Sequence, residues 1–393
     1  MIQFLNGISR PSLKSNHKLN MTKVYVIVNY HKSIVEVTSQ TIVQKNYIKL
    51  LSDIGYDVVV LYPKWGDEIN KVLEAKNYVC LDIDGYTNRS ILPYEYIKFL
   101  KKEKLNDVII YTFQSDNAID LVTELSNPPY VFPKIINHFI AGDEYEPNNP
   151  KNLKRIIGFS LPTIYNSDYA KAMNEKKMFK AGISPFEFFA KSKHFIANLG
   201  IPFSSINRVK STEKNEKFTF LFPGNSLMSF KNFDVFIKIF DKLYETGRKF
   251  EVKLFLLNKD FGKTGLDRPY ISLNKTLPRE EFFKEASKCH AFLSTSKGET
   301  YGLAYWELCE AGVLGLFFNK PWVKKIGNVD DYFVFNNVEE GVSKAAILMD
   351  RYEEYQNLFS KWWNENRERF EDVKCDEEYK KNVQELITNL LNV

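Results

Sequence analysis

The feature that most constrains the fold is a repeated alternation of short apolar runs with segments of helical periodicity. In the first half of the chain, apolar runs lie at Lys23–Tyr30, Asp57–Tyr62, Tyr78–Ile83, Asp107–Thr112, Lys134–Asn137 and Thr163–Asn166. A helical pattern at Thr38–Ser52 separates the first two. Strands that alternate with helices predict a parallel sheet covered on both faces, and nearly continuous apolar character is typical of strands buried in this way.

The same alternation restarts after a polar segment, Lys210–Lys217. Strands are predicted at Phe218–Phe222, Glu251–Leu257, Tyr270–Leu273 and Ala291–Ser294, and helices at Asn232–Glu245, Arg279–Lys288 and Leu303–Ala311. The sequence therefore predicts an α/β protein with two doubly wound domains, residues 21–210 and 211–370. Residues 1–20 are expected to form a flexible arm, so both Met1 and Met21 are candidates for the natural start.

Size, charge and cysteine usage narrow the class of protein. A chain of 393 residues is long enough for two domains with well-buried cores. A net charge of +5 favours a phosphate-bearing ligand or an anionic surface and is too small to require nucleic acid. The four cysteines form no CxxC pair and are expected to be reduced, mostly buried thiols of a cytoplasmic protein. No apolar run approaches ~18 residues, so no transmembrane segment is expected, and peripheral membrane contact stays open.

One segment, residues 294–320, carries the pattern that points most directly to chemistry. Glu299 and Glu307 stand eight positions apart, about two helical turns, on either side of a turn at Gly302. A loop that enters a helix presents free backbone N–H groups and the positive end of a dipole, which together suit a phosphate. Carboxylates on both sides of such a loop suit a ligand with a central phosphate and a hydroxylated ring at each end, as in a nucleotide-sugar. A solvated helix with two surface acids is the alternative interpretation.

These residues resemble the retaining GT-B glycosyltransferases, family 4 in particular. The pair Glu299 and Glu307 is similar to the family's paired Glu motif, and Gly224 with Lys231 is similar to its Gly-Arg and following Lys. Asn198–Ile201 is similar to its Asn-x-Gly-Ile element. The likeness covers the second half well and the first half only in the rhythm of its elements. It implies the GT-B fold, two Rossmann-like domains that face a cleft, with the last helix, about 370–393, packed back on the first domain.

The resemblance also implies an activity and roles for individual residues. The activity is transfer of a sugar, with retention, from a nucleoside diphosphate sugar to an acceptor hydroxyl. Glu307 would hold the ribose, Glu299 would hold hydroxyls of the donor sugar, and Lys231 would neutralise the leaving pyrophosphate, so that no metal or other cofactor is required. The backbone N–H groups that would meet the distal phosphate belong to Tyr301, Gly302 and Leu303.

The chain departs from the family pattern in three places. Asn225, after Gly224, stands where the family's Arg usually lies, and Lys231 comes one residue late. Asn29–Lys32 occupies the loop after the first strand, where a glycine pair is usual. A missing Arg removes one phosphate clamp, so a non-catalytic nucleotide-sugar-binding protein on the same fold is an alternative function.

Four residues of the first half are candidates for the acceptor side of the site. His138 follows the apolar run KIIN, where the resemblance implies a histidine near the donor sugar or the acceptor. A packed core histidine is the alternative. Asp143 and Glu144 are nearby alternatives as acceptor-binding or base residues, and His31 is a weaker candidate in the first loop.

The remaining alternatives concern whether the protein has a metal site and which molecule accepts the sugar. Asp82-Ile83-Asp84 is similar to the metal-binding DxD of another transferase class, but we interpret it as the end of a strand. No cysteine or histidine spacing suits zinc, so no metal site is predicted. The expected acceptor is a saccharide or a glycolipid. The alternative is hydroxymethylated DNA of the phage type, since scattered lysines could form a basic face in space.

Overall fold

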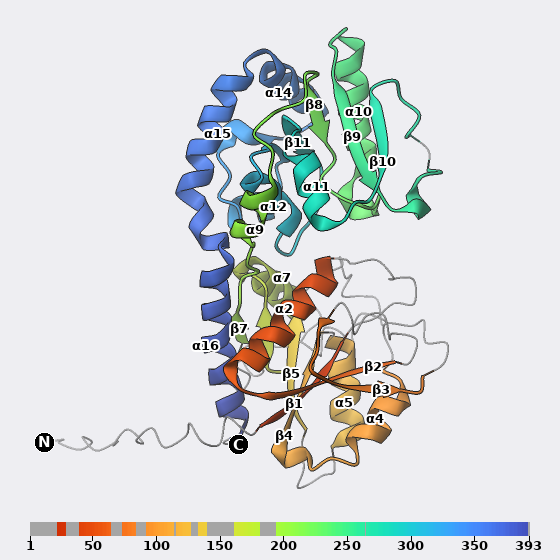
Figure 1. The fold of residues 1–393 in the computed structure, drawn as a ribbon, viewed down its shortest axis with the longest axis vertical. Coiled ribbons are helices and arrows are strands. Elements are labelled where there is room, and N and C mark those ends of the chain that lie inside the picture. Colours follow the sequence, from red (N-terminus) through yellow and green to blue (C-terminus); the bar gives the residue numbers. More distant parts are fainter. Residues whose placement is uncertain are drawn as a thin grey trace, which may run out of the picture.

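The computed structural model describes residues 22–28, 39–63, 73–83, 92–113, 115–126, 133–139, 161–180, 194–263 and 265–391. The described part of the chain forms two parallel sheets, each with helices packed against it (Figure 1). The first has the strand order β3-β2-β1-β4-β5-β6-β7 and the second the order β10-β9-β8-β11-β12-β13. Two doubly wound, Rossmann-like halves were predicted from the alternation of elements, and this fold class is confirmed.

The first sheet follows the predicted strands closely. Its strands are β1 (Lys23–Ile27), β2 (Asp57–Pro63), β3 (Asn77–Leu81), β4 (Val108–Thr112), β5 (Lys134–Phe139), β6 (Thr163–Tyr165) and β7 (His194–Ile196). The helical segments of this half are α2 (Ser39–Ile54), α4 (Tyr94–Leu100), η2 (Leu105–Asp107), α5 (Ser115–Leu125), α7 (Asp168–Lys180) and α9 (Phe203–Val209). Every residue of β4 is buried, as expected for a strand inside a parallel sheet covered on both faces.

The second sheet starts after the polar segment near residue 210. Its strands are β8 (Thr219–Leu221), β9 (Glu251–Leu256), β10 (Ile271–Lys275), β11 (Ala291–Ser294), β12 (Leu314–Phe318) and β13 (Val334–Phe335). The helical segments up to the last strand are η3 (Ser229–Lys231), α10 (Phe233–Glu245), η4 (Asn258–Asp260), α11 (Arg279–Ala286), α12 (Leu303–Glu310), α13 (Pro321–Lys325) and η5 (Asp331–Phe333). They are followed by α14 (Val338–Asp350), α15 (Tyr352–Asn366), η6 (Arg367–Phe370) and α16 (Asp372–Leu391).

Helices α15 and α16 follow one another along the same side of both sheets (Figure 1). Helix α16 packs on α2 and β7 of the first half, and the Asn382 amide donates to the carbonyl oxygen of Ile196 at 2.7 Å. Its apolar side chains Tyr379, Val383 and Leu386 are buried. The C-terminal helix therefore belongs to the packing of the first sheet, although it follows the second sheet in the chain.

The chain passes between the two halves in two segments that lie side by side. The amide of Ile201 donates to the carbonyl oxygen of Phe370 at 2.8 Å, and the amide of Asp372 donates to that of Ile201 at 3.2 Å. A Cβ atom on Gly200 would come within 2.5 Å of the Asp372 Cα. The glycine of the Asn-x-Gly-Ile element is thus explained by close approach of two backbones.

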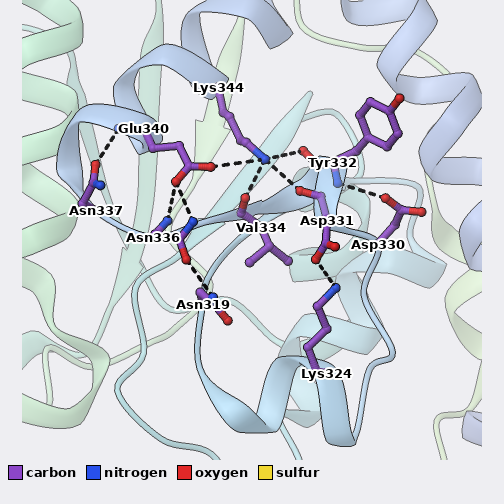
Figure 2. Close-up of polar contacts among 10 residues, drawn as sticks. All are labelled: Asn319, Lys324, Asp330, Asp331, Tyr332, Val334, Asn336, Asn337, Glu340 and Lys344. Carbon is purple, nitrogen blue, oxygen red and sulfur yellow. Dashed lines mark hydrogen bonds and ion pairs between the residues drawn. The ribbon is translucent and has the colours of Figure 1, made fainter.

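The edge strand β13 pairs with β12 on one side, and Lys344 bonds to it and to the η5 turn before it. The Lys344 ammonium donates to the carbonyl oxygens of Asp331, Tyr332 and Val334 at 2.8, 3.1 and 2.6 Å, as Figure 2 shows. Glu340 pairs with the same ammonium at 3.6 Å and accepts from the Asn336 amide at 2.9 Å. These contacts satisfy carbonyl groups in and before β13, which is the last strand of this sheet among the described residues.

Among the described residues, none of the helices is both long enough and apolar enough to span a bilayer. The four cysteines are free thiols, and three of them, Cys289, Cys309 and Cys375, are buried.

Candidate active site

The candidate site lies where the strand order of the second sheet reverses. Strands β8 and β11 are neighbours, and the chain leaves them in opposite directions along the sheet, toward β9 and toward β12. Ligands of doubly wound sheets bind at this point, outside the carboxyl ends of the strands. The loop after β8 carries Gly224, Asn225 and Lys231, and the loop after β11 carries Glu299, Tyr301 and Gly302. The fold therefore brings the two predicted motifs to one edge of the sheet.

The Glu299 carboxylate is held on one of its two oxygens. Lys231 Nζ lies 2.6 Å from Oε1, the Ser296 hydroxyl donates to the same atom at 2.9 Å, and the Tyr305 hydroxyl does so at 3.0 Å. Among the described residues, no donor reaches Oε2. Three donors thus fix the orientation of the carboxylate and leave one oxygen available to a ligand hydroxyl.

Lys231 ends the short helix η3, and its backbone is fastened to the loop that carries Glu299. The Thr295 hydroxyl donates to the Lys231 carbonyl oxygen at 2.8 Å, and the amide of Lys297 donates to that of Phe230 at 2.8 Å. The next residue, Asn232, has a positive φ of 54° and turns the chain into α10. The predicted lysine is therefore attached at several points to the loop of the predicted glutamate.

The Lys231 ammonium has two acceptors among the described residues, Glu299 and the Tyr305 hydroxyl, which is 3.1 Å away. One of its three N–H bonds therefore has no protein acceptor in the described part of the chain. Burial opposes the charged form, but Glu299 and Tyr305 outweigh it and raise the pKa of Lys231 above its ordinary value. The side chain is therefore a fixed cation with one N–H that has no acceptor among the described residues.

Helix α12 begins at this cluster. Its N-cap residue, Gly302, has a φ of 78°, and a Cβ atom there would lie 3.1 Å from both Trp322 and Tyr305. A positive φ and this close packing both favour glycine. The first amides of the helix, at Gly302 and Leu303, have no acceptor among the described residues, as is usual at a helix N-terminus. The Tyr301 ring is buried and its carbonyl oxygen accepts from Trp306 at 2.7 Å, so only the backbone amide of this residue can serve a phosphate.

Glu307 lies one to two turns further along α12 and is paired with a cation that sequence analysis missed. Arg279, the first residue of α11, donates to Glu307 Oε1 at 2.5 Å and stacks 5.0 Å from the ring centre of Phe283. The Glu307 side chain is 10% exposed. Arg279 follows the carboxyl end of β10 by four residues, and this position at the ligand-binding edge was the available signal. The contact itself joins two helices and leaves no trace in the sequence.

Gly224 and Asn225 lie in the connection from β8 to η3. A Cβ atom on Gly224 would be 3.8 Å from the Lys231 side chain, and the Asn225 carbonyl oxygen accepts from the amide of Leu257 at 2.9 Å. Asp260, whose side chain is 1% exposed, accepts from the amide of Leu227 at 3.3 Å. These bonds tie the loop to the end of β9, so the backbone around Asn225 is anchored on the side away from β11.

The strand ends of the two sheets face each other at the site. Ser167, two residues beyond β6, donates from its hydroxyl to the carbonyl oxygen of Thr300 at 2.6 Å. The Asn166 amide donates to the Thr300 hydroxyl at 3.2 Å. Thr300 directly follows Glu299, so the first half contacts the loop of the candidate site.

His138 lies on β5 and is completely buried. The Tyr111 hydroxyl contacts its Nδ1 at 2.5 Å, and the rings of Tyr47 and Phe113 lie 4.3 and 5.5 Å away. Tyr379 of α16 stacks on it at 6.1 Å. Burial lowers the pKa of His138 to about 3, so the imidazole is neutral. These contacts favour the packed interpretation. The other acceptor candidates, His31, Asp143 and Glu144, lie outside the described residues.

The second carboxylate of α12, Glu310, has both of its oxygens bonded to neighbouring side chains of the protein. Its oxygens accept from Asn207 at 2.7 Å, Arg367 at 2.7 Å and the Trp363 indole at 3.0 Å. It therefore joins α12 to α9 and to the α15–η6 segment. Both Glu310 oxygens accept from protein donors, whereas Glu299 and Glu307 each accept on Oε1 alone among the described residues.

Solved structures similar to this chain include several glycosyltransferases. A glycosyltransferase from Rickettsia africae aligns with 94% of this chain and 100% of its own, at 13% identity and a TM-score of 0.66. The pneumococcal O-GlcNAc transferase GtfA, solved with UDP and GlcNAc, aligns over 93% and 99% at 10% identity, with a TM-score of 0.65. Anabaena HepE, solved with UDP-glucose, aligns over 95% and 100% at 11% identity, with a TM-score of 0.64.

At these identities the likeness establishes the fold, which is the GT-B arrangement of two Rossmann-like domains. Neither a protein-family model nor a curated protein sequence matches the chain.

Proposed function

We propose that this protein is a glycosyltransferase that moves a sugar from a nucleoside diphosphate sugar to an acceptor hydroxyl. The observation that carries the proposal is the Lys231–Glu299 pair beside the N-terminus of α12. In the described part of the chain, it combines a fixed cation that has one N–H without an acceptor, a carboxylate that has one oxygen without a donor, and backbone amides without an acceptor. A surface pair of acids on a solvated helix would be exposed and would have no fixed cation beside it, whereas the Lys231 and Glu299 side chains are 15% and 14% exposed.

Each group has a role in the transfer. Lys231 and the amides at Tyr301, Gly302 and Leu303 bind the pyrophosphate, with Gly224 and Asn225 alongside. Glu299 Oε2 accepts from hydroxyls of the donor sugar, and Glu307 accepts from the ribose. Charge-assisted hydrogen bonds of this kind are short and directional, so they orient a ring firmly.

The bond from the anomeric carbon to the phosphate oxygen breaks as the acceptor oxygen bonds to that carbon. Negative charge then grows on the leaving diphosphate, next to Lys231 and the start of α12, so the same contacts strengthen in the transition state. We propose that a phosphate oxygen takes the acceptor proton and that the anomeric configuration is retained. The resemblance to family 4 motivates retention.

The proposed acceptor is a saccharide or a glycolipid, recognised by the first half of the chain. Asp143, Glu144 and His31 remain proposed acceptor residues. Direct contact between His138 and a sugar would require Tyr47 or Tyr379 to move, because both rings pack on the imidazole.

The function is tested in two steps. Calorimetry with UDP, GDP and ADP identifies the base, with UDP tried first because two similar proteins were solved with UDP or UDP-glucose. Labelled sugar nucleotide is then incubated with oligosaccharides, lipid-linked saccharides and hydroxymethylated DNA. Label in a saccharide or lipid supports the proposal, and label in DNA alone changes the acceptor. Nucleotide binding with no transfer and no donor hydrolysis would identify a non-catalytic binding protein, and no nucleotide binding would overturn the assignment.

A further inference from the structure

Among the tyrosines that the structure describes, Tyr305 is the one whose hydroxyl joins both charged groups of the candidate site. It donates to Glu299 Oε1 at 3.0 Å and lies 3.1 Å from Lys231 Nζ, from which it accepts. The Lys231 ammonium also lies 4.8 Å from the centre of the Tyr305 ring. A hydroxyl can donate and accept at once, so this group contacts both an anion and a cation. Among the described residues, their other polar partners are each other and, for Glu299, the Ser296 hydroxyl.

The ring of Tyr305 is held rigidly beneath the pair. It is 1% exposed and stacks on Trp322 at 5.1 Å, with Phe292 at 5.9 Å and Phe317 at 6.2 Å. Tyr305 is the third residue of α12, and its buried ring contacts the Lys231–Glu299 pair from within the domain. Glu299 Oε2 and the remaining Lys231 N–H, which have no partner in the described chain, are the groups left for the ligand.

We propose that Tyr305 is a positioning residue for sugar transfer, which holds Glu299 Oε1 and Lys231 so that Glu299 Oε2 and one ammonium N–H meet the donor. This inference rests on the proposed function. When the pyrophosphate draws the ammonium away from Glu299, the Tyr305 hydroxyl still donates to the buried carboxylate. A carboxylate left with a single donor would be less well oriented, and an unpaired buried charge is unfavourable.

The protonation state of Tyr305 suits this role. Burial and the neighbouring Glu299 charge raise its pKa to about 12. The hydroxyl therefore keeps its proton at physiological pH, and that proton is directed at the carboxylate.

The first test is Tyr305→Phe, which removes the hydroxyl and keeps the aromatic packing. With UDP-glucose and UDP-N-acetylglucosamine as probes, we expect kcat/KM to fall about ten- to a hundredfold, the effect of one hydrogen bond to a charged group. The affinity for UDP alone should fall less than kcat/KM does, since UDP lacks the sugar that Glu299 would hold and keeps only the diphosphate contact with Lys231. The matched control is Tyr270→Phe, which removes a tyrosine hydroxyl bonded to the Asp241 carboxylate at 2.6 Å, away from the site.

A double-mutant cycle separates positioning from a merely structural role. If Tyr305 acts through Glu299, then Tyr305→Phe in a Glu299→Gln background should reduce kcat/KM by less than about threefold further, because the two effects share one interaction. Fully additive losses would overturn the proposal, as would an unchanged kcat/KM in the single variant.

A second measurement does not depend on the proposed function. Acetylation of Lys231 by acetic anhydride at pH 9, followed by mass spectrometry, reports its neutral fraction relative to exposed Lys297. Removing the Tyr305 hydroxyl should raise Lys231 reactivity at least threefold, because a polar acceptor of the ammonium is lost. Unchanged reactivity would overturn the role of Tyr305 even if the enzyme is a transferase. Raised reactivity in a protein that binds no nucleotide would keep the contact and overturn the function.

Discussion

At the scale of single residues, Glu307 is distinguished by having one strong partner and one free oxygen. Arg279 binds Oε1, and no described residue donates to Oε2. The guanidinium therefore orients the carboxylate without saturating it, and the ribose hydroxyls can occupy the second oxygen. The proposed ribose contact depends on this arrangement.

We predict that Glu307→Ala weakens UDP binding and leaves the fold intact. Loss of charge-assisted hydrogen bonds to the ribose should decrease the binding free energy by ~1.5–3 kcal/mol for each bond. Calorimetry with UDP and with 2′-deoxy-UDP checks the assignment, since the variant should discriminate less between them. Glu280→Ala is the control, because Glu280 is an exposed acid of the neighbouring helix that pairs with exposed Arg208. Equal UDP affinity in wild type and Glu307→Ala would exclude a ribose contact.

Lys231 should matter more for the rate than for ground-state binding. We predict that Lys231→Ala reduces kcat by about a hundredfold or more and weakens UDP affinity less, because negative charge grows on the leaving group during transfer. Turnover of the wild type should survive EDTA. Steady-state kinetics with the accepted donor checks both, with Lys297→Ala, an exposed lysine of the adjacent loop, as control. A strict manganese requirement, together with loss of that manganese-dependent turnover on changing Asp82, would contradict the metal-free assignment.

Sequence analysis predicted the candidate residues that have a fixed spacing and missed those defined by contact. Glu299, Glu307 and Gly302 lie in one continuous segment, and the fold brings Lys231 to Glu299 as expected. Arg279 and Tyr305 act through side chains that meet only after the helices have packed. In a chain with 54 basic residues and 22 tyrosines, residue type alone could not single them out.

At the scale of elements, strands made of several consecutive buried apolar residues were predictable from the sequence, and the shortest strands were not. Strand β11 has the predicted bounds, because four buried residues in a row leave a plain signal. Strand β13 has only two residues, and β7 has three of intermediate burial, so neither pattern rises above that of a loop. Helix α10 starts one residue after its predicted beginning, because Asn232 adopts a left-handed conformation there. Such a conformation depends on the loop before it as much as on the residue itself.

The crossing between the two halves gives an element-scale prediction. Gly200→Val should lower the free energy of unfolding by ~1–3 kcal/mol, because a Cβ atom would lie 2.5 Å from the Asp372 backbone and force the two segments apart. Urea unfolding checks it. Gly262→Ala is the control, since a Cβ atom there meets nothing within 4 Å. Equal stability of Gly200→Val and wild type would mean that the two backbones are not packed together as described.

At the scale of the whole molecule, the two sheets, the crossing segments and α16 form one connected unit. The Ser167–Thr300 bond joins the strand ends of both halves, and α16 returns to the first sheet after the second is complete. We propose that the chain divides near residue 210, with α16 as part of the first domain. The fold class followed from the sequence because each half repeats the same alternation, whereas the contacts between the halves join residues far apart in the chain.

The buried histidines give the whole molecule a predicted dependence on pH. Burial lowers the pKa of His138 to about 3 and those of His194 and His290 to about 4. An unfolded histidine has a pKa of about 6.5, so each of the three takes up a proton on unfolding between these values. Asp376 acts in the opposite direction, because burial raises its pKa to about 6 and it releases a proton on unfolding.

Near pH 5, unfolding should therefore take up about two protons, three by histidines less one from Asp376. The free energy of unfolding should fall by about 2–3 kcal/mol for each pH unit as the pH decreases from 6 toward 5. Urea unfolding at half-unit steps measures this slope. His290→Asn should reduce this slope, because it removes one of the three titrating imidazoles. The Asn carbonyl oxygen can still accept from the Thr219 amide that bonds to His290 Nδ1 at 3.1 Å in the wild type. A stability that stays constant across this range would show that the three imidazoles are not held neutral by the fold.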